Sequence, residues 1–208
     1  MTSAEIQSAL KQVEQQTDTN VKALLLAALV SEEFRMAGFE PVVVGGSAVE
    51  FYTDGAYMSG DTDICWKGMR VPTPVEKSAV IAKFPNAKGS PRSWQIGGLF
   101  IDLLGEITTY ATNDYTTVET PFGKVVLQPV EDLIVERVFS ARCWTGFNPD
   151  DDACAKKLIS ACLRGDVAVD WDETARLAQL PAYRCAEALA AIKQEVAEAL
   201  ATADTDCD

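Results

Sequence analysis

The sequence predicts a mixed α/β (α+β) fold, in which a small mixed β-sheet carries N-terminal helices and a C-terminal helical extension. Three observations predict this class. Apolar side chains recur at helical spacing over residues 3–38, short β-branched runs separated by Gly and Pro fill residues 39–127, and helical spacing returns after Pro129. We therefore expect a core with its N-terminal helices at 1–128, a helical region at 129–203 and an acidic tail at 204–208.

Each predicted element has a local signal in periodicity or in turn residues. Two helices before Gly38 are separated near Asp18, where the polar run Asp-Thr-Asn interrupts the apolar pattern. The remaining elements, in chain order, are a strand over 39–44, a helix over 47–57, a strand over 61–66, a helix over 75–84, strands over 94–96 and 99–104 around a Gly-Gly turn, strands over 115–119 and 125–127, and helices from 129, over 153–163 and over 182–200.

Composition narrows the classes of function. The chain has no histidine, which excludes Ser-His and Cys-His catalysis and histidine-ligated zinc. A formal charge of −13 argues against an extended surface for duplex nucleic acid, because such surfaces need clustered Lys and Arg. The apolar stretch at 23–30 is shorter than the roughly 20 residues that span a bilayer, and the N-terminus does not resemble a signal peptide. We expect a cytoplasmic protein with no membrane partner.

The six cysteines are scattered along the chain, and no two have the close spacing of a zinc or thioredoxin-like site. We expect reduced thiols that pack as small apolar side chains. No cysteine is assigned a catalytic role.

A pair of acidic residues marks the start of one predicted strand. Asp61 and Asp63 are two positions apart, so the pleat directs both carboxylates to one face, while Thr62 and Ile64 face the other. Two neighbouring carboxylates repel each other unless a cation lies between them, and hard oxygen ligands suit Mg²⁺ or Mn²⁺. An Asp-x-Asp pair taken alone is more often part of a solvated turn than of a metal site.

A glycine turn precedes the acidic pair. Gly45, Gly46 and Ser47 lie where a predicted strand passes into a helix, so that free N–H groups, the positive end of the helix dipole and a hydroxyl meet without side-chain obstruction. This arrangement suits a triphosphate. The alternative is a tight turn in which Ser47 serves as the helix N-cap.

A third acidic residue interrupts an apolar strand. Asp102 stands within Phe-Ile-Asp-Leu-Leu, and a carboxylate buried there needs a metal, a cation or hydrogen-bond donors. Glu106 is a reserve third carboxylate on the same face, provided that Gly105 does not break the strand.

These three parts follow one another in the order found in the DNA polymerase beta-like nucleotidyltransferase superfamily, which the chain resembles over roughly residues 40–160. Within the superfamily, the chain most resembles the branch that contains the toxins of type IV abortive-infection toxin–antitoxin systems, through the segment GGSAVEFYTDGAYMSGDTDI. The later helical region of that branch resembles the segment PVEDLIVERVFSAR. A departure is that residues 52–60 contain no basic residue, where relatives often have one. Arg137 and Arg142 could supply that charge, or be ion-paired helix residues.

The resemblance implies a metal-dependent nucleotidyltransferase that moves an NMP group from an NTP such as ATP to a hydroxyl of a small molecule, a protein or an RNA. It implies Mg²⁺ or Mn²⁺ at Asp61, Asp63 and Asp102, and triphosphate contacts at Gly45, Gly46 and Ser47. The resemblance also implies one biological role, that of the toxin-like component of a toxin–antitoxin pair, with a cognate regulatory protein as its partner. The alternative is a catalytically silent nucleotide-binding or protein-interaction module of the same fold. A Rossmann-like dinucleotide site is disfavoured, because the glycine spacing is wrong.

Overall fold

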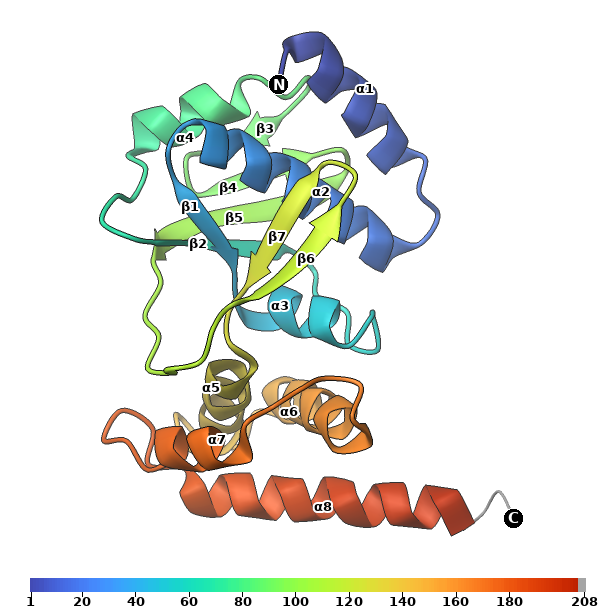
Figure 1. Ribbon diagram of the computed structural model, residues 1–208, viewed down its shortest axis with the longest axis vertical. Coiled ribbons are helices and arrows are strands. Elements are labelled where there is room, and N and C mark those ends of the chain that lie inside the picture. Colours follow the sequence, from blue (N-terminus) through green and yellow to red (C-terminus); the bar gives the residue numbers. More distant parts are fainter. Residues whose placement is uncertain (206–208) are drawn as a thin grey trace. The chain divides into compact units, whose positions relative to one another are not determined.

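The computed structural model describes residues 1–205 (Figure 1). Within them the chain forms eight helices and a seven-stranded mixed sheet, which confirms the predicted fold class. The chain divides into two compact units. The core unit comprises Met1–Phe51, Met58–Thr108 and Tyr115–Gln128, and the helical unit comprises Tyr52–Tyr57, Thr109–Asp114 and the chain from Pro129 onward.

The core unit contains the sheet, whose strand order is β3-β4-β5-β2-β1-β7-β6. The β2–β5 and β1–β7 pairs are parallel, and the other neighbours are antiparallel. Its elements are α1 (Ser3–Glu14), α2 (Thr19–Met36), β1 (Glu40–Val43), α3 (Gly45–Tyr52), β2 (Thr62–Lys67), α4 (Pro74–Ile81), β3 (Lys88–Gly89), β4 (Ser93–Ile96), β5 (Leu99–Glu106), β6 (Thr116–Thr120) and β7 (Gly123–Leu127).

One face of the sheet packs on α2 and holds the apolar core. In β2, residues alternate between buried Thr62, Ile64 and Trp66 and half-buried residues, as the predicted strand pleat requires. The ring of Trp66 lies 4.7 Å from that of Phe34 in α2, and its indole N–H donates to the carbonyl of Leu104 at 3.0 Å. The opposite face of β2 is therefore free to carry polar side chains.

The helical unit is built from α5 (Val130–Arg142), α6 (Pro149–Arg164), α7 (Trp171–Ala178) and α8 (Ala186–Thr205). An ion-pair network joins three of these helices: Arg142 of α5 bridges Asp152 and Glu195, and Lys156 of α6 bridges the same two carboxylates. Because several charges share partners, this network holds α8 against α5 and α6 better than isolated surface pairs would.

Several predicted boundaries need correction. The helix predicted over 47–57 spans 45–52, because Asp54 and Gly55 have positive φ angles of 48° and 77° that end it in a turn. Val44 lies after the end of β1. The short β3 and α7 were not predicted, whereas β5 continues through Gly105 to Glu106. The last helix begins at 186 and runs through 205, two residues into the predicted acidic tail; the rest of that tail lies outside the described residues.

Among the described residues, no helix has the length and apolarity required to cross a bilayer. The predicted stretch 23–30 lies inside α2, where its side chains are mostly buried.

Glu173 of α7 fastens the segment 109–114 to the helical unit. Its carboxylate accepts the backbone N–H of Thr112 at 2.7 Å and the hydroxyl of the same residue at 2.9 Å, and it pairs with Arg176 at 2.6 Å. The Arg176 hydrogen bond is the largest cause that lowers the pKa of Glu173 from 4.5 to about 2.

We predict that Glu173→Gln lowers the free energy of unfolding at pH 7. Because the folded pKa is depressed, the contribution of this carboxylate is present above pH 4.5 and is lost as the pH falls toward about 2. When unfolding in urea is measured between pH 7 and pH 2.5, the unfolding free energies of wild type and Glu173→Gln should become equal at the acidic end of this range. Glu198→Gln, an exposed change in the middle of α8, is the control that should match wild type throughout. A difference in unfolding free energy that stays constant at all pH values would contradict this account.

Candidate active site

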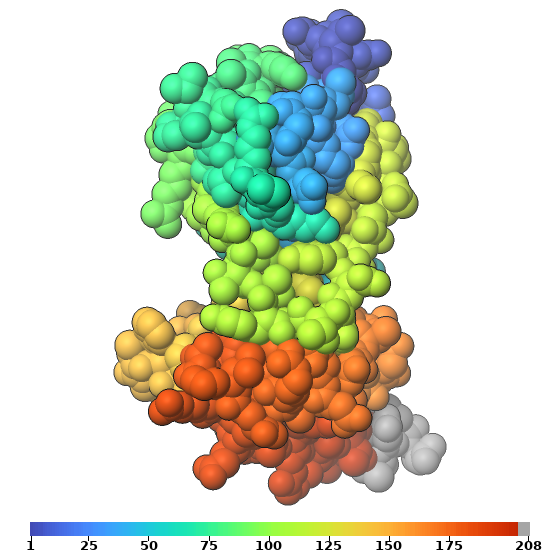
Figure 2. Space-filling model, turned by 60° about the vertical axis from the view of Figure 1, so that its left-hand side comes forward, coloured from blue at the N-terminus to red at the C-terminus, as the bar shows by residue number. Residues whose placement is uncertain are grey.

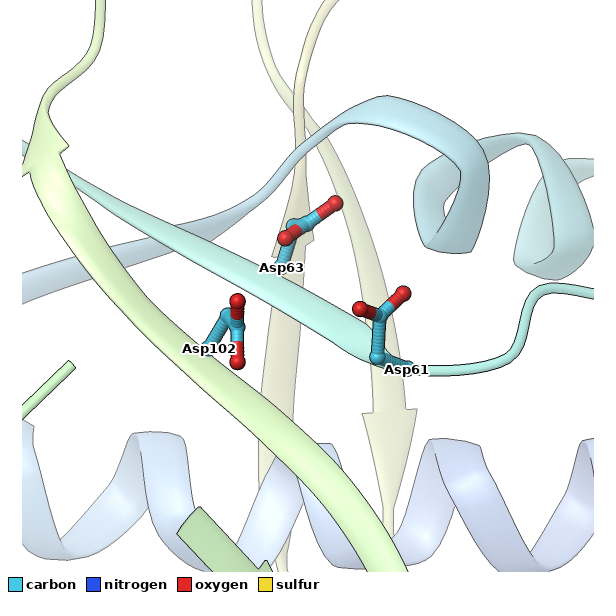
Figure 3. Close-up of side chains that lie close together, drawn as sticks. All are labelled: Asp61, Asp63 and Asp102. Carbon is cyan, nitrogen blue, oxygen red and sulfur yellow. The ribbon is translucent and has the colours of Figure 1, made fainter. Parts of the chain in front are cut away.

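Three carboxylates gather on the face of the sheet that is turned away from α2 (Figure 3). Asp61 is exposed just before β2, whereas Asp63 in β2 and Asp102 in β5 are half-buried. One carboxylate oxygen from each lies within 4.8 Å of those from the other two. The structure thus brings together all three acidic residues that the sequence singled out, and their catalytic role remains a prediction.

Strand pairing explains this convergence. Asp63 is the register partner of Asp102 in the parallel β2–β5 pair, and side chains at paired positions project from the same face. Asp61, two residues before Asp63, shares that face through the pleat. The spacing of two along one strand and the register between two strands place the three carboxylates together.

A ring of hydrogen bonds ties Asp63 to the glycine turn. The Asp63 N–H donates to the Ser47 hydroxyl at 3.0 Å, the hydroxyl donates to the Val44 carbonyl at 3.0 Å, and the Val44 N–H donates to the Asp63 carbonyl at 3.0 Å. Ser47 is 1% exposed and is the third residue of α3. Its hydroxyl therefore holds β2 against the β1–α3 junction, which the sequence did not reveal.

Gly45 lies directly beside the acidic cluster. Its φ angle is +63°, and a Cβ atom built on it would lie 3.2 Å from Oδ2 of Asp63. Both the left-handed backbone and this close approach favour glycine. Because Gly45 is the first residue of α3, the Asp63 carboxylate lies at the positive end of that helix, which offsets part of the repulsion from the other acids.

Glu50 is a further residue of the site that sequence reasoning missed. It is 2% exposed, and its Oε2 accepts the N–H of Ser59 at 2.6 Å, which anchors the loop leading into Asp61. Burial raises the pKa of this carboxyl, and the Ser59 hydrogen bond opposes the shift. The sequence signal that could have revealed it is a charged residue four positions after Gly46, next to the apolar Ala48 and Val49, which are buried in the structure.

The candidate phosphate-binding arginines are occupied within the helical unit. Arg137 pairs with Asp151 at 2.8 Å, and Arg142 belongs to the network with Asp152 and Glu195. The ion-paired interpretation of these two residues is therefore the one that the structure supports. Glu106 lies at the end of β5 but does not belong to the carboxylate cluster.

The donor set fits a hard divalent cation. All of its side chains are carboxylates, which suits Mg²⁺ or Mn²⁺ better than a soft metal. Three carboxylates this close repel one another strongly, so a cation between them would remove a destabilising interaction. Together with the N–H groups of the first turn of α3, the site combines cation ligands with donors for an anion.

Comparisons with known proteins add two structural likenesses. No protein-family model and no curated protein matches the chain. An antigenic nucleotidyltransferase-like protein from Paracoccidioides brasiliensis has a TM-score of 0.49 and 16% identity, over 88% of this chain and 92% of that one. The antibiotic-resistance factor ANT(2'')-Ia has a TM-score of 0.42 and 14% identity, over 95% and 97% of the two chains. Both TM-scores lie below 0.5, so the chemistry of this chain is inferred from its own residues.

Proposed function

We propose that the protein is a metal-dependent nucleotidyltransferase that moves an NMP group from an NTP to a hydroxyl acceptor. The observation that supports this most is the convergence of Asp61, Asp63 and Asp102 beside the Gly45 turn. Cation ligands and a close-approach glycine at a helix N-terminus are the parts that nucleotidyl transfer needs next to each other.

The triphosphate side of the site is assigned to the first turn of α3. Gly45 and Gly46 leave room for a phosphate to approach the backbone, and the first N–H groups of a helix have no acceptor within it. Ser47 takes part through its N–H, because its hydroxyl already donates to Val44. No basic side chain is needed for this contact, which agrees with the absence of Lys and Arg from 52–60.

The proposed reaction is an in-line displacement at the α-phosphorus. The acceptor oxygen forms a bond to that phosphorus while the bond to the β-phosphate oxygen breaks, and pyrophosphate leaves with the electron pair of that bond. Asp102 faces the acceptor and receives the hydroxyl proton on a carboxylate oxygen, from which it passes to solvent. Mg²⁺ or Mn²⁺ held by the three carboxylates would neutralise triphosphate charge and lower the pKa of the acceptor hydroxyl.

The second candidate is a catalytically silent module that binds nucleotide or another protein through the same fold. It requires no carboxylate cluster, whereas the in-register pairing of Asp63 with Asp102 maintains one at an electrostatic cost. Incubation with labelled NTPs and Mg²⁺, followed by mass spectrometry of small molecules, proteins and RNA, separates the two. Pyrophosphate release with a labelled acceptor supports transfer, and nucleotide binding without turnover supports the module.

We predict that Asp61→Asn, Asp63→Asn and Asp102→Asn each lower metal-dependent turnover by about 100-fold or more, since each removes a cation ligand. With a chelator present, the thermal midpoints of these variants should equal or exceed that of wild type, because one repelling charge is gone. Added Mg²⁺ should raise the midpoint of wild type and leave those of the variants nearly unchanged. Pyrophosphate release and thermal unfolding are the two measurements.

Glu106→Gln is the matched control, since it removes an exposed carboxylate from the same strand outside the cluster. It should keep wild-type turnover. If the toxin-like role holds, expression of wild type should arrest growth and expression of Asp63→Asn should not. Wild-type turnover in all three aspartate variants would contradict the assignment and favour the silent module.

We predict that Gly45→Ala impairs turnover more than stability. The methyl group would press on Asp63, and the left-handed backbone costs a non-glycine residue about 1 kcal/mol. Gly98→Ala is the matched control, because Gly98 has a similar positive φ of 84° and nothing within 4 Å of a built Cβ. Both variants should lose comparable unfolding free energy in urea, and only Gly45→Ala should lose turnover. Equal effects on turnover would show that the close approach to Asp63 is unimportant.

A further inference from the structure

A second pocket of the core unit lies beyond Asp102 along β5. It has a volume of about 520 Å³, within the range of small-molecule sites. Its walls come from α4, the segment before β4 and the end of β5, and in Figure 2 these segments, coloured teal to yellow-green, gather on one face of the unit. The lining residues are Pro74, Lys77, Pro91, Arg92, Leu103, Leu104 and Gly105.

The pocket contains two cations and no carboxylate. Lys77 is 9% exposed, and its ammonium donates to the carbonyls of Leu103 and Leu104, both at 2.7 Å. These bonds use two of its three donors and bring no negative charge. Arg92 is exposed at the pocket wall. Within residues 1–205 neither side chain forms an ion pair, although the chain carries a net charge of −13.

The electrostatic balance of Lys77 agrees with this description. Burial lowers the pKa of its ammonium, the nearby Cys65 opposes that shift, and Arg92 adds to it. A buried charge is costly unless it is paired, and two like charges increase the cost. An anion bound between Lys77 and Arg92 would offset both contributions.

The sheet places this pocket on the opposite side of the acidic pair from the glycine turn. In the order β4-β5-β2-β1, the Gly45 turn follows β1, whereas the pocket belongs to β5 and the start of β4. Leu104 shares a face with Asp102 and lies roughly 7 Å from it along the strand. The ammonium of Lys77 lies 6.0 Å from the centre of the Trp66 ring, which packs on α2, so the pocket opens beside β5 on the α2 side, whereas Asp102 faces the other side. The pairing of β4 with β5 ends at Ser93 and Asp102, so an acceptor of metabolite size would reach Asp102 around the strand edge at Leu104 and Gly105.

We propose that this pocket binds an oxyanion of the acceptor substrate, a phosphate or a carboxylate, and so selects an anionic acceptor. The anion site follows from the pocket itself, and its link to the acceptor rests on the proposed nucleotidyl transfer. Charge-assisted hydrogen bonds from Lys77 and Arg92 to the oxyanion would hold the acceptor with its hydroxyl toward Asp102.

A purely structural role for Lys77 is the competing explanation. In that case the ammonium only caps the two carbonyls at the end of β5, and Arg92 is a solvated surface residue. The two explanations differ in what Arg92 and Gly105 do, because neither residue contributes to the capping. Gly105 lines the pocket, and a Cβ built on it meets nothing within 4 Å, so a side chain there would occupy pocket space without strain.

The test measures anion binding to the full chain in the presence of a chelator, where the acidic cluster repels anions. Inorganic phosphate and acetate are titrated separately by NMR, which distinguishes the two oxyanions. We expect wild type to bind at least one of them, Arg92→Gln to bind it about tenfold more weakly, and Gly105→Val, which keeps both charges, to bind it weakly or not at all. Lys88→Gln, an exposed charge change in β3 outside the pocket, should bind as wild type does.

Binding that is absent in wild type, or equal in Arg92→Gln and Lys88→Gln, would overturn the anion site. The acceptor link is tested with the acceptor identified by mass spectrometry and its analogue without the anionic group. Arg92→Gln should raise KM for the anionic acceptor and leave KM for the analogue unchanged; equal changes for both would overturn the link. Anion binding without turnover on any acceptor would leave the anion site standing and remove the proposed transfer.

Discussion

The in-register pairing of β2 with β5 is the constraint on which the candidate site depends. It sets Asp63 beside Asp102 in a cluster that consists of carboxylates alone. Like charges at this separation would drive two flexible segments apart, so the strands that carry them must be held from behind. The fully buried Ile64, Trp66, Ile101 and Leu103 provide that support on the opposite face. Burial of the apolar side stabilises a polar side that would not form alone.

The hydrogen-bond ring through Ser47 extends this support to the junction between β1 and α3. Ser47 accepts from the backbone of Asp63 and donates to that of Val44, so a shift of β2 would break bonds at the start of α3. The Gly45 turn and the acid pair consequently move as one piece, although 13 residues separate Ser47 from Asp61. Preorganisation of this kind fixes the distance between cation ligands and phosphate donors before any substrate binds.

Sequence reasoning succeeded where a local pattern determines the outcome. The alternation around Asp63, the Gly-Gly hairpin before β5 and the apolar neighbours of Asp102 each predict an element and a face. It could not predict contacts between segments that lie far apart in the sequence. Nothing near Lys77 indicates that its ammonium reaches the end of β5, and Ser47 looks like an N-cap until β2 is seen beside it. The short β3 exists only through its pairing with β4, because two residues carry no periodicity.

The charge distribution explains how so acidic a chain could bind polyanionic substrates. Many of its cations are neutralised by nearby carboxylates, as at Arg35, Lys83, Arg137 and Arg142. Screening over about 8 Å at physiological ionic strength confines the net charge to short range, so local groups decide what each cleft attracts. The acidic cluster repels a bare triphosphate and attracts one that carries its own cation. Lys77 and Arg92, at the pocket farther along β5 from Asp102, instead attract an anion that carries no bound metal. In the proposed function, the donor and the acceptor are therefore distinguished by whether their negative charge arrives already paired with a cation.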